Sequence, residues 1–213
     1  MGVEHPKQYL DIHGRPMLWH TIHAFESHPA IERVYVVISP QDGWWDGYDW
    51  SAFAKLVVLR QGGATRAESV LNGLCACAGE VAAEDWMLVH DAARPCISRA
   101  LLDKLLARLD SDPVGGILAA PVADTLKRQA GDGRIAATVP RAGLWGAQTP
   151  QMFRHGMLTQ ALQAAGNEVT DEASAIESLG LAPQLVESDL TNLKVTYPRD
   201  LDIAAWLLAG NGC

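Results

Sequence analysis

The chain has 213 residues and a formal net charge of −8, and 48% of its residues are hydrophobic. This composition is typical of a globular protein rather than a disordered or fibrous one, and the acidic balance argues against broad binding to nucleic acids or anionic membranes. No apolar run approaches the roughly 20 residues that cross a bilayer, and the N-terminus lacks the apolar core of a signal peptide. The four cysteines show neither metal-ligand spacing nor a disulfide framework. We therefore expect a reduced, soluble, cytoplasmic protein.

Strand-like and helix-like segments alternate along the first half of the chain. Runs rich in β-branched and apolar residues predict buried strands, and runs with apolar residues on one helical face predict helices between them. The strands are expected at 33–39, 55–59, 86–90 and 116–120, and the helices begin at Pro16, at Arg66 and after the capping residue Ser98. This alternation predicts βαβ units, and therefore an α/β fold with a mostly parallel sheet.

The alternation of strands and helices stops over residues 121–145, where two short strand-like runs flank the turn of Gly131, Asp132 and Gly133. This pattern predicts a projecting β-hairpin arm rather than another βαβ unit. Beyond the arm, the sequence predicts helices over 154–165 and 170–180, strands over 184–187 and 193–195, and a closing helix near Pro198. We interpret residues 1–213 as one domain.

Candidate site residues follow the predicted strands, because ligands of parallel α/β sheets bind beyond the carboxyl ends of the strands. Asp91 and Arg94 come directly after the strand at 86–90. A carboxylate there can hold Mg²⁺ and an arginine can bind phosphate bidentately; alternatively, the two side chains only pair or cap the loop. Gly62 and Gly63 precede a helix N-terminus that suits an anion, although a plain turn is the more common explanation.

Basic side chains gather near the predicted strand ends and on the arm. Lys7, in an irregular segment, suits a phosphate but is also typical of exposed surface. Lys194 lies in the predicted strand 193–195, where a charge is costly unless it is paired or reaches a ligand. The other basic residues of the set are Arg66, Arg94, Lys127 and Arg141. With Asp91 among them, they predict a focused anion site for a phosphate-rich ligand and a divalent metal.

Two further features receive structural interpretations. Asp171 and Glu172 lie in the first turn of a predicted helix beside the cap Thr170, where they compensate the helix dipole. A loop rich in tryptophan is expected to cover an edge or to act as a lid, and it contains Trp44, Trp45 and Trp50.

Seven segments resemble one known family in the same order: PKQYL, GGATRAESVLNGL, LVHDAARP, GGILAAPVADTLKR, GLWGAQTPQMF, TDEASAIESLG and NLKVT. They are similar to the 2-C-methyl-D-erythritol 4-phosphate cytidylyltransferases of the non-mevalonate isoprenoid pathway, over about residues 4–208. The resemblance implies a single Rossmann-like nucleotidyltransferase domain and a homodimer joined by the arm. The implied reaction transfers a cytidylyl group from CTP to 2-C-methyl-D-erythritol 4-phosphate and releases pyrophosphate.

The resemblance also implies roles for individual residues. Lys7, Arg141 and Lys194 would act in catalysis, and Asp91 would bind Mg²⁺ or another divalent cation. The nucleotide would be bound by Gly63, Arg66 and Ser69. The acceptor would be bound by Arg94, Thr125, Arg141, Thr149 and Lys194. Of these, Thr125 and Arg141 would reach the partner's site from the arm.

Some positions depart from the family pattern. Relatives begin with a strand and a glycine-rich loop before the PKQYL segment, whereas this sequence starts at Met1 and Gly2, where that motif ends. Either the sequence omits a natural N-terminal segment or it is a truncated, inactive form; we favour omission, because a parallel sheet without its central strand would be poorly stable. Pro140 and Thr191 stand where relatives often carry acids, so the second metal ligand is unassigned.

Two alternative functions remain open at this point. One is a cytidylyltransferase for another polyol phosphate, such as ribitol 5-phosphate. The other is a non-catalytic module that binds a nucleotide or a sugar phosphate. An NAD-dependent enzyme is disfavoured, since no GxGxxG motif follows a predicted strand.

Overall fold

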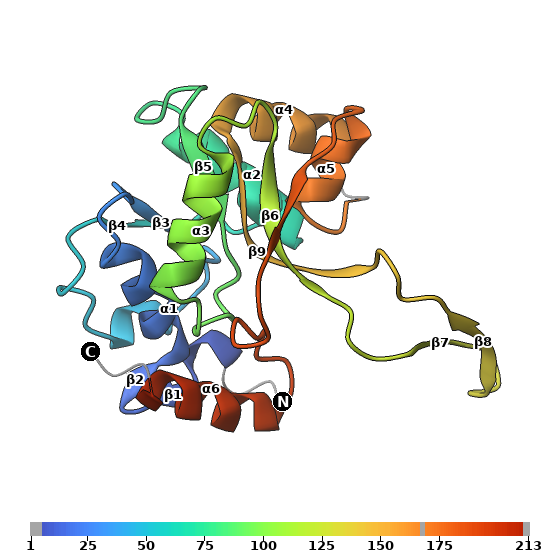
Figure 1. Cartoon of the computed structure of the whole chain (residues 1–213). Coiled ribbons are helices and arrows are strands. Elements are labelled where there is room, and N and C mark those ends of the chain that lie inside the picture. The colour runs from blue at the N-terminus through green and yellow to red at the C-terminus, as the bar shows by residue number, and fades with distance from the viewer. Residues whose placement is uncertain (1–5, 167–168, 211–213) are drawn as a thin grey trace.

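The computed structural model describes residues 6–166 and 169–210 (Figure 1). Its largest sheet has four strands in the order β10-β6-β9-β5. The strands are β5 (Trp86–Val89), β6 (Gly115–Pro121), β9 (Trp145–Arg154) and β10 (Gln184–Glu187). β10 runs parallel to β6, and β9 runs antiparallel to both β6 and β5. Three of the four strands therefore point in one direction, which confirms the predicted α/β fold with a mostly parallel sheet.

The remaining strands form three separate pairs. β3 (Val34–Val37) and β4 (Leu56–Leu59) are parallel, whereas β1 (Asp11–Ile12) with β2 (Arg15–Pro16), and β7 (Leu126–Gln129) with β8 (Ile135–Val139), are antiparallel. The helices are α1 (Met17–Glu26), α2 (Arg66–Cys77), α3 (Arg99–Leu109), α4 (His155–Ala165), α5 (Glu172–Ser178) and α6 (Pro198–Gly210), with short 3₁₀ turns η1 (Lys7–Tyr9) and η2 (Trp45–Gly47).

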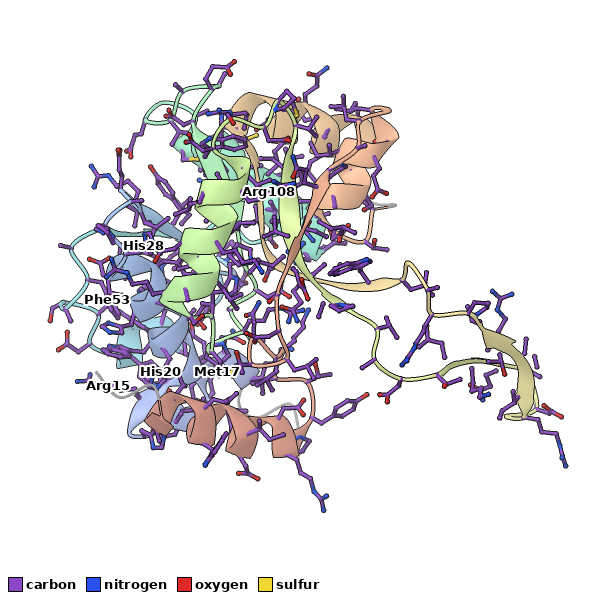
Figure 2. All side chains as sticks on the ribbon, viewed as in Figure 1. Arg15, Met17, His20, His28, Phe53 and Arg108 are labelled. Atoms are coloured by element: carbon purple, nitrogen blue, oxygen red, sulfur yellow. The ribbon has the colours of Figure 1, made fainter. Side chains whose placement is uncertain are left out.

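Helices cover both faces of the four-stranded sheet (Figure 1). Alternate residues of a strand point to opposite faces, and the core divides accordingly. On β6, Leu118 belongs to the cluster built with α3, while Ile117 and Ala119 belong to the cluster built with α2, α4 and α5. The sheet is thus the middle of three layers. At the edge of α3, His28 Nε2 and Asp103 Oδ1 are 2.9 Å apart and link the end of α1 to this helix (Figure 2).

A large cavity lies between the β3–β4 pair and the four-stranded sheet. It has a volume of about 1230 Å³, and every residue of β3 and of β5 contributes to its lining. Among the described residues, β3 pairs only with β4, and β5 pairs only with β9. One edge of each of these two strands therefore has no strand partner. Lys7, Arg66, Asp91 and Lys194 also line this cavity, so it is the natural place to seek a ligand.

The β7–β8 hairpin projects from the body of the molecule (Figure 1). Its turn contains Gly133 at φ +83°, a left-handed conformation that glycine adopts without strain. The side chains of the arm stand apart from the rest of the protein (Figure 2), and Ile135 is 66% exposed. The structure therefore confirms the hairpin arm that the sequence predicts within residues 121–145.

Two details of the predicted secondary structure are wrong. Residues 193–195 do not form a strand, because this segment makes one backbone hydrogen bond, from Val195 N–H to the Ala93 carbonyl at 2.8 Å. Thr170 does not cap α5. The cap is Asp171, whose carboxylate accepts from the Ser174 N–H while the Ser174 hydroxyl bonds back to the Asp171 N–H, a reciprocal capping box.

Some sequence features lie outside the described residues, among them Met1, Gly2 and Cys213. The other three cysteines are free thiols. In the part of the chain that the structure describes, no helix is both long enough and apolar enough to cross a membrane.

Candidate functional site

The candidate site forms where three distant segments meet beyond the carboxyl end of β5. Asp91 follows β5 directly, and Arg66 is the first residue of α2, whose N-cap Thr65 accepts from the Glu68 N–H. The bond between Val195 N–H and the Ala93 carbonyl places the segment before α6 alongside the loop after β5. Residues more than 100 positions apart in sequence thereby come within contact distance.

Asp91 is the centre of a cluster of cations. Its Oδ2 lies 2.8 Å from Lys194 Nζ and 3.9 Å from Arg94 Nε, and its Oδ1 accepts from Arg66 Nε at 2.9 Å. Burial alone would raise the pKa of Asp91, but the hydrogen bond from Lys194 and the charge of Arg66 outweigh it and lower the pKa to about 2. Asp91 is therefore ionised at neutral pH, and the surrounding cations outnumber it.

Arg66 also binds a second carboxylate. Its Nη1 and Nη2 donate to the two oxygens of Glu172 at 2.6 and 2.9 Å, a bidentate arrangement. Glu172 is fully buried in the first turn of α5. Burial alone would lower the pKa of Arg66, but the hydrogen bonds and charge of Glu172 raise it above its ordinary value. The sequence alone does not reveal this role, because an acid in the first helical turn is explained equally well by the helix dipole.

Arg94 contributes its charge from inside the protein. It is 8% exposed, and its Nη1 donates to the Asn192 carbonyl at 2.7 Å. Its Nε is buried and has no hydrogen-bond partner among the described residues, and the nearest carboxylate is Asp91. Burial lowers the pKa of this guanidinium. Arg94 is not among the residues that line the cavity, and its charge acts there through Asp91, which does line it.

Thr149 connects β9 to the loop after β5. Its hydroxyl accepts from the Asp91 N–H at 3.0 Å and lies 3.0 Å from His90 Nδ1. His90 Nε2 is 3.0 Å from the Arg94 carbonyl, so this nitrogen carries the proton and Nδ1 accepts from the hydroxyl. Burial lowers the pKa of His90 to about 4, which keeps the ring neutral. The Thr149 hydroxyl is thus already engaged by two protein groups.

Two other predicted residues, Lys7 and Ser69, line the same cavity, and Gly63 contacts one of them. Lys7 Nζ donates to the Val195 carbonyl at 3.5 Å, next to Lys194. Ser69 Oγ accepts from the Gly63 N–H at 3.0 Å and donates to the Thr65 carbonyl at 2.8 Å. Gly63 is therefore held by the helix that it precedes.

The structure does not bring the predicted arm residues to this cluster. Thr125 and Arg141 are exposed, at the two ends of the hairpin. Lys127 is on β7, where its Nζ donates to Thr138 Oγ1 of β8 at 2.7 Å. The β7–β8 hairpin lies away from β5 and α2, the elements that position Asp91 and Arg66 (Figure 1).

The donor set around Asp91 gives limited support for a metal. Within residues 6–166 and 169–210, no three histidine, cysteine or acidic side chains gather as a metal site. Of the described carboxylates that line the cavity, only Asp91 forms ion pairs with the cations there. Mg²⁺ commonly takes one or two protein carboxylates together with phosphate oxygens of the substrate, so Asp91 fits a metal that arrives with a nucleotide.

Together, the α/β fold and the cations around Asp91 define the class of this protein, an α/β protein whose site suits a phosphate-bearing ligand. Residues 1–210 match the family model described as IspD, 2-C-methyl-D-erythritol 4-phosphate cytidylyltransferase. The chain belongs to this family, and it is an enzyme of the cytidylyltransferase class.

Individual relatives agree with the family match. The chain is 62% identical over 208 residues to the 2-C-methyl-D-erythritol 4-phosphate cytidylyltransferase of Dechloromonas aromatica, covering 97% of this chain and 91% of the relative. It is 58% identical to the enzyme of the same name from Thiobacillus denitrificans, covering 98% and 91%.

Solved structures are similar as well. A crystal structure of a 4-diphosphocytidyl-2C-methyl-D-erythritol synthase matches with a TM-score of 0.89 at 46% identity, covering 95% of each chain. The Francisella tularensis 2-C-methyl-D-erythritol 4-phosphate cytidylyltransferase matches with a TM-score of 0.84 at 35% identity, covering 96% of this chain and 94% of that one.

Proposed function

We propose that this enzyme transfers the cytidylyl group of CTP to 2-C-methyl-D-erythritol 4-phosphate and releases pyrophosphate. The observation that carries the proposal is the cluster in which Arg66, Arg94 and Lys194 surround Asp91 at the carboxyl end of β5. The family match and the names of the relatives favour this acceptor over ribitol 5-phosphate, and favour catalysis over binding alone.

The main requirement of this reaction is that the enzyme stabilises negative charge on the phosphate oxygens. The acceptor phosphate has a second pKa of about 6, so it is a nucleophile at neutral pH without a strong base. Its oxygen attacks the α-phosphorus of CTP in line with the departing pyrophosphate, and negative charge grows on the oxygens around that phosphorus. In the immediate surroundings of Asp91, positive charge is in excess, because the cations outnumber the carboxylates: Lys7, Arg66, Arg94 and Lys194 against Asp91 and Glu172.

We assign the residues as follows. Lys7 and Lys194 stabilise charge on the triphosphate during transfer, and Gly63, Arg66 and Ser69 hold the nucleotide. The acceptor is positioned by Arg94, Thr149 and Lys194, together with Thr125 and Arg141 of a second copy's arm, where Arg141 also acts in catalysis.

Asp91 would hold Mg²⁺ or another divalent cation. Bound there, the metal would neutralise charge on the phosphate oxygens. A metal held there would compete with Arg66 and Lys194 for the oxygens of Asp91. The ionised state of Asp91 at neutral pH supports this role.

We further propose that residues 1–213 form a single domain, that two copies associate through the arm, and that the enzyme works in the cytoplasm. An exposed hairpin that carries predicted site residues supports association, because Thr125 and Arg141 do not line the cavity around Asp91 in their own chain.

The proposed function is tested by measuring pyrophosphate release from CTP, Mg²⁺ and 2-C-methyl-D-erythritol 4-phosphate. We expect release that depends on this acceptor and that ribitol 5-phosphate does not match. Comparable release with ribitol 5-phosphate would overturn the acceptor assignment. Binding of CTP without any release would indicate a binding module instead.

The two lysines provide the first mutational prediction. Lys7→Ala and Lys194→Ala should each lower kcat by about 10²–10³, by analogy with removing one donor of an oxyanion hole, while circular dichroism and Tm stay close to wild type. The control is Lys104→Ala on α3, whose Nζ contacts the Glu187 carbonyl away from the cavity. Near-normal kcat in both variants would remove these lysines from the mechanism.

A further inference from the structure

Glu172 is a fully buried carboxylate to which the proposed chemistry gives no contact with substrate. Acidic side chains are almost never fully buried unless they are paired. The pair here is specific, because both Glu172 oxygens receive hydrogen bonds from one guanidinium, at 2.6 and 2.9 Å. The two partners are 106 positions apart, on α5 and α2.

The guanidinium of Arg66 is shared between two carboxylates of different character. Glu172 is inaccessible to solvent, and Arg66 is its one ion-pair partner among the described residues. Asp91 is 12% exposed at the side chain, lines the cavity, and is shared with Lys194. A ligand in this cavity that brings phosphate groups or a metal ion competes for the Asp91 contacts, whereas Glu172 does not line this cavity.

The difference between the two carboxylates affects ligand binding because the Arg66 guanidinium is a rigid plane, called the fork below. Arg66 has five N–H donors in fixed directions. Three are used, two by Glu172 and one by Asp91. One N–H on each terminal nitrogen stays available for a ligand, and its direction is set by the orientation of the whole fork.

We propose that Glu172 is a positioning residue that anchors the Arg66 guanidinium, so that Arg66 keeps its orientation when the Asp91 contacts exchange on ligand binding. The part of this inference that concerns CTP rests on the proposed function. Glutamine at this position keeps the size of the side chain but has one acceptor oxygen and no charge, so it accepts a hydrogen bond from only one of the two Nη groups of Arg66. If the Glu172–Arg66 contact only linked α2 to α5, the substitution would lower Tm without a selective rise in the KM for CTP.

The experiment compares Glu172→Gln with Glu177→Gln, an exposed glutamate on the same helix. We expect Glu172→Gln to raise KM for CTP about tenfold or more, as for loss of a charged hydrogen bond. The KM for the acceptor and kcat should change less than about threefold, because the lost contact acts on nucleotide binding. Glu177→Gln should match wild type. In an Arg66→Lys background, which lacks the fork, Glu172→Gln should add little to the KM for CTP.

Two results would overturn the inference. One is a lower Tm in Glu172→Gln with an unchanged KM for CTP, which is the outcome for a structural link. The other comes from NMR of the wild-type protein, so it does not depend on the variant folding. If the guanidinium is anchored, rotation about its C–N bonds is slow and the Nη groups of Arg66 give separate resonances. We expect separate resonances both without ligand and with saturating CTP and Mg²⁺. Merging of these resonances on ligand binding would contradict anchoring.

The same measurements separate this inference from the proposed function. If wild-type enzyme releases no pyrophosphate from CTP, the proposed function fails. The Nη resonances of the free protein still decide whether Glu172 anchors Arg66, because they should be separate in wild type and merged in Glu172→Gln.

Discussion

His90 shows how one residue can support a site by holding the neighbouring groups in place. Its neutral ring links the Arg94 carbonyl to the Thr149 hydroxyl, and through that hydroxyl to the backbone of Asp91. Protonation would place a donor on Nδ1, which must accept in this arrangement. The geometry of the loop after β5 therefore depends on a histidine that stays neutral.

The lowered pKa of His90 predicts a pH dependence of stability. The ordinary pKa is 6.5 and the folded value is about 4. Between these values the unfolded chain binds more protons than the folded one, so the free energy of unfolding rises with pH. The contribution is complete above pH 6.5 and is lost as the pH falls towards 4, and its size is on the order of 3 kcal/mol.

Urea unfolding of wild type and His90→Gln between pH 7.5 and 4.5 measures this contribution. Other groups titrate in the same range, so the difference between the two proteins is the relevant quantity. We expect that difference to shrink as the pH falls from 6.5 to 4.5. Parallel curves for the two proteins would show that His90 does not titrate in this window.

At the residue scale, much of the candidate site could be predicted from the sequence. The sequence predicts three of the site residues, Asp91, Arg94 and Arg66, because they follow predicted strands and the carboxyl ends of parallel strands lie at the same edge of the sheet. Lys194 was expected for a reason that the structure does not support, since it lies in an irregular segment and not in a strand. Glu172 was missed because its partner is 106 residues away, and no local pattern reports such a contact.

At the scale of elements, β9 is the main feature that the sequence did not predict. It lies between β6 and β5, yet its sequence has no apolar alternation, because Gln148, Thr149 and Gln151 are buried and polar. Their side chains are satisfied by long-range partners. Gln151, for example, donates to the Asp171 carboxylate at 2.9 Å and accepts from the Ala173 N–H at 2.8 Å. Patterns based on hydrophobicity cannot detect a strand whose buried face is polar.

The junction of β9 with the loop after β5 can be tested at Thr149. Thr149→Val keeps the shape of the side chain but removes the hydroxyl, leaving the Asp91 N–H and His90 Nδ1 without their partner. We expect a loss of about 1–3 kcal/mol in the free energy of unfolding. Thr149→Ser, which keeps the hydroxyl, should retain most of the stability, as measured by urea titration.

The same pair of variants examines the proposed contact of Thr149 with the acceptor. If the hydroxyl mainly holds Asp91 in place, Thr149→Val should lower kcat together with stability. If it mainly binds the acceptor, the KM for 2-C-methyl-D-erythritol 4-phosphate should rise while stability stays near that of wild type.

At the scale of the whole molecule, the cavity between β3 and β5 divides the sheet system into two parts. Val34 and Ile38 N–H groups donate to the Lys55 and Leu59 carbonyls of the β4 side, each at 2.9 Å. In a parallel pair alternate residues face opposite sides, so the N–H groups of Tyr35 and Val37 face away from β4. Both residues line the cavity.

This arrangement predicts alternating protection along β3. The amides of Tyr35 and Val37 should exchange with solvent deuterium at least about tenfold faster than those of Val34 and Ile38. Residue-resolved hydrogen exchange by NMR measures this directly, and the β4-facing amides of the same strand are the internal control. Equal protection of all four amides would show that β3 has a second hydrogen-bonding partner in solution.

The placement of these bare strand edges has a consequence for self-association. Unpaired edges normally invite another chain to add a strand, which is a route to aggregates. Here the unpaired edges of β3 and β5 both border one cavity. A segment of another chain that entered this cavity would meet unpaired backbone groups of two strands at once, and the net charge of −8 supplies repulsion between copies that opposes such pairing.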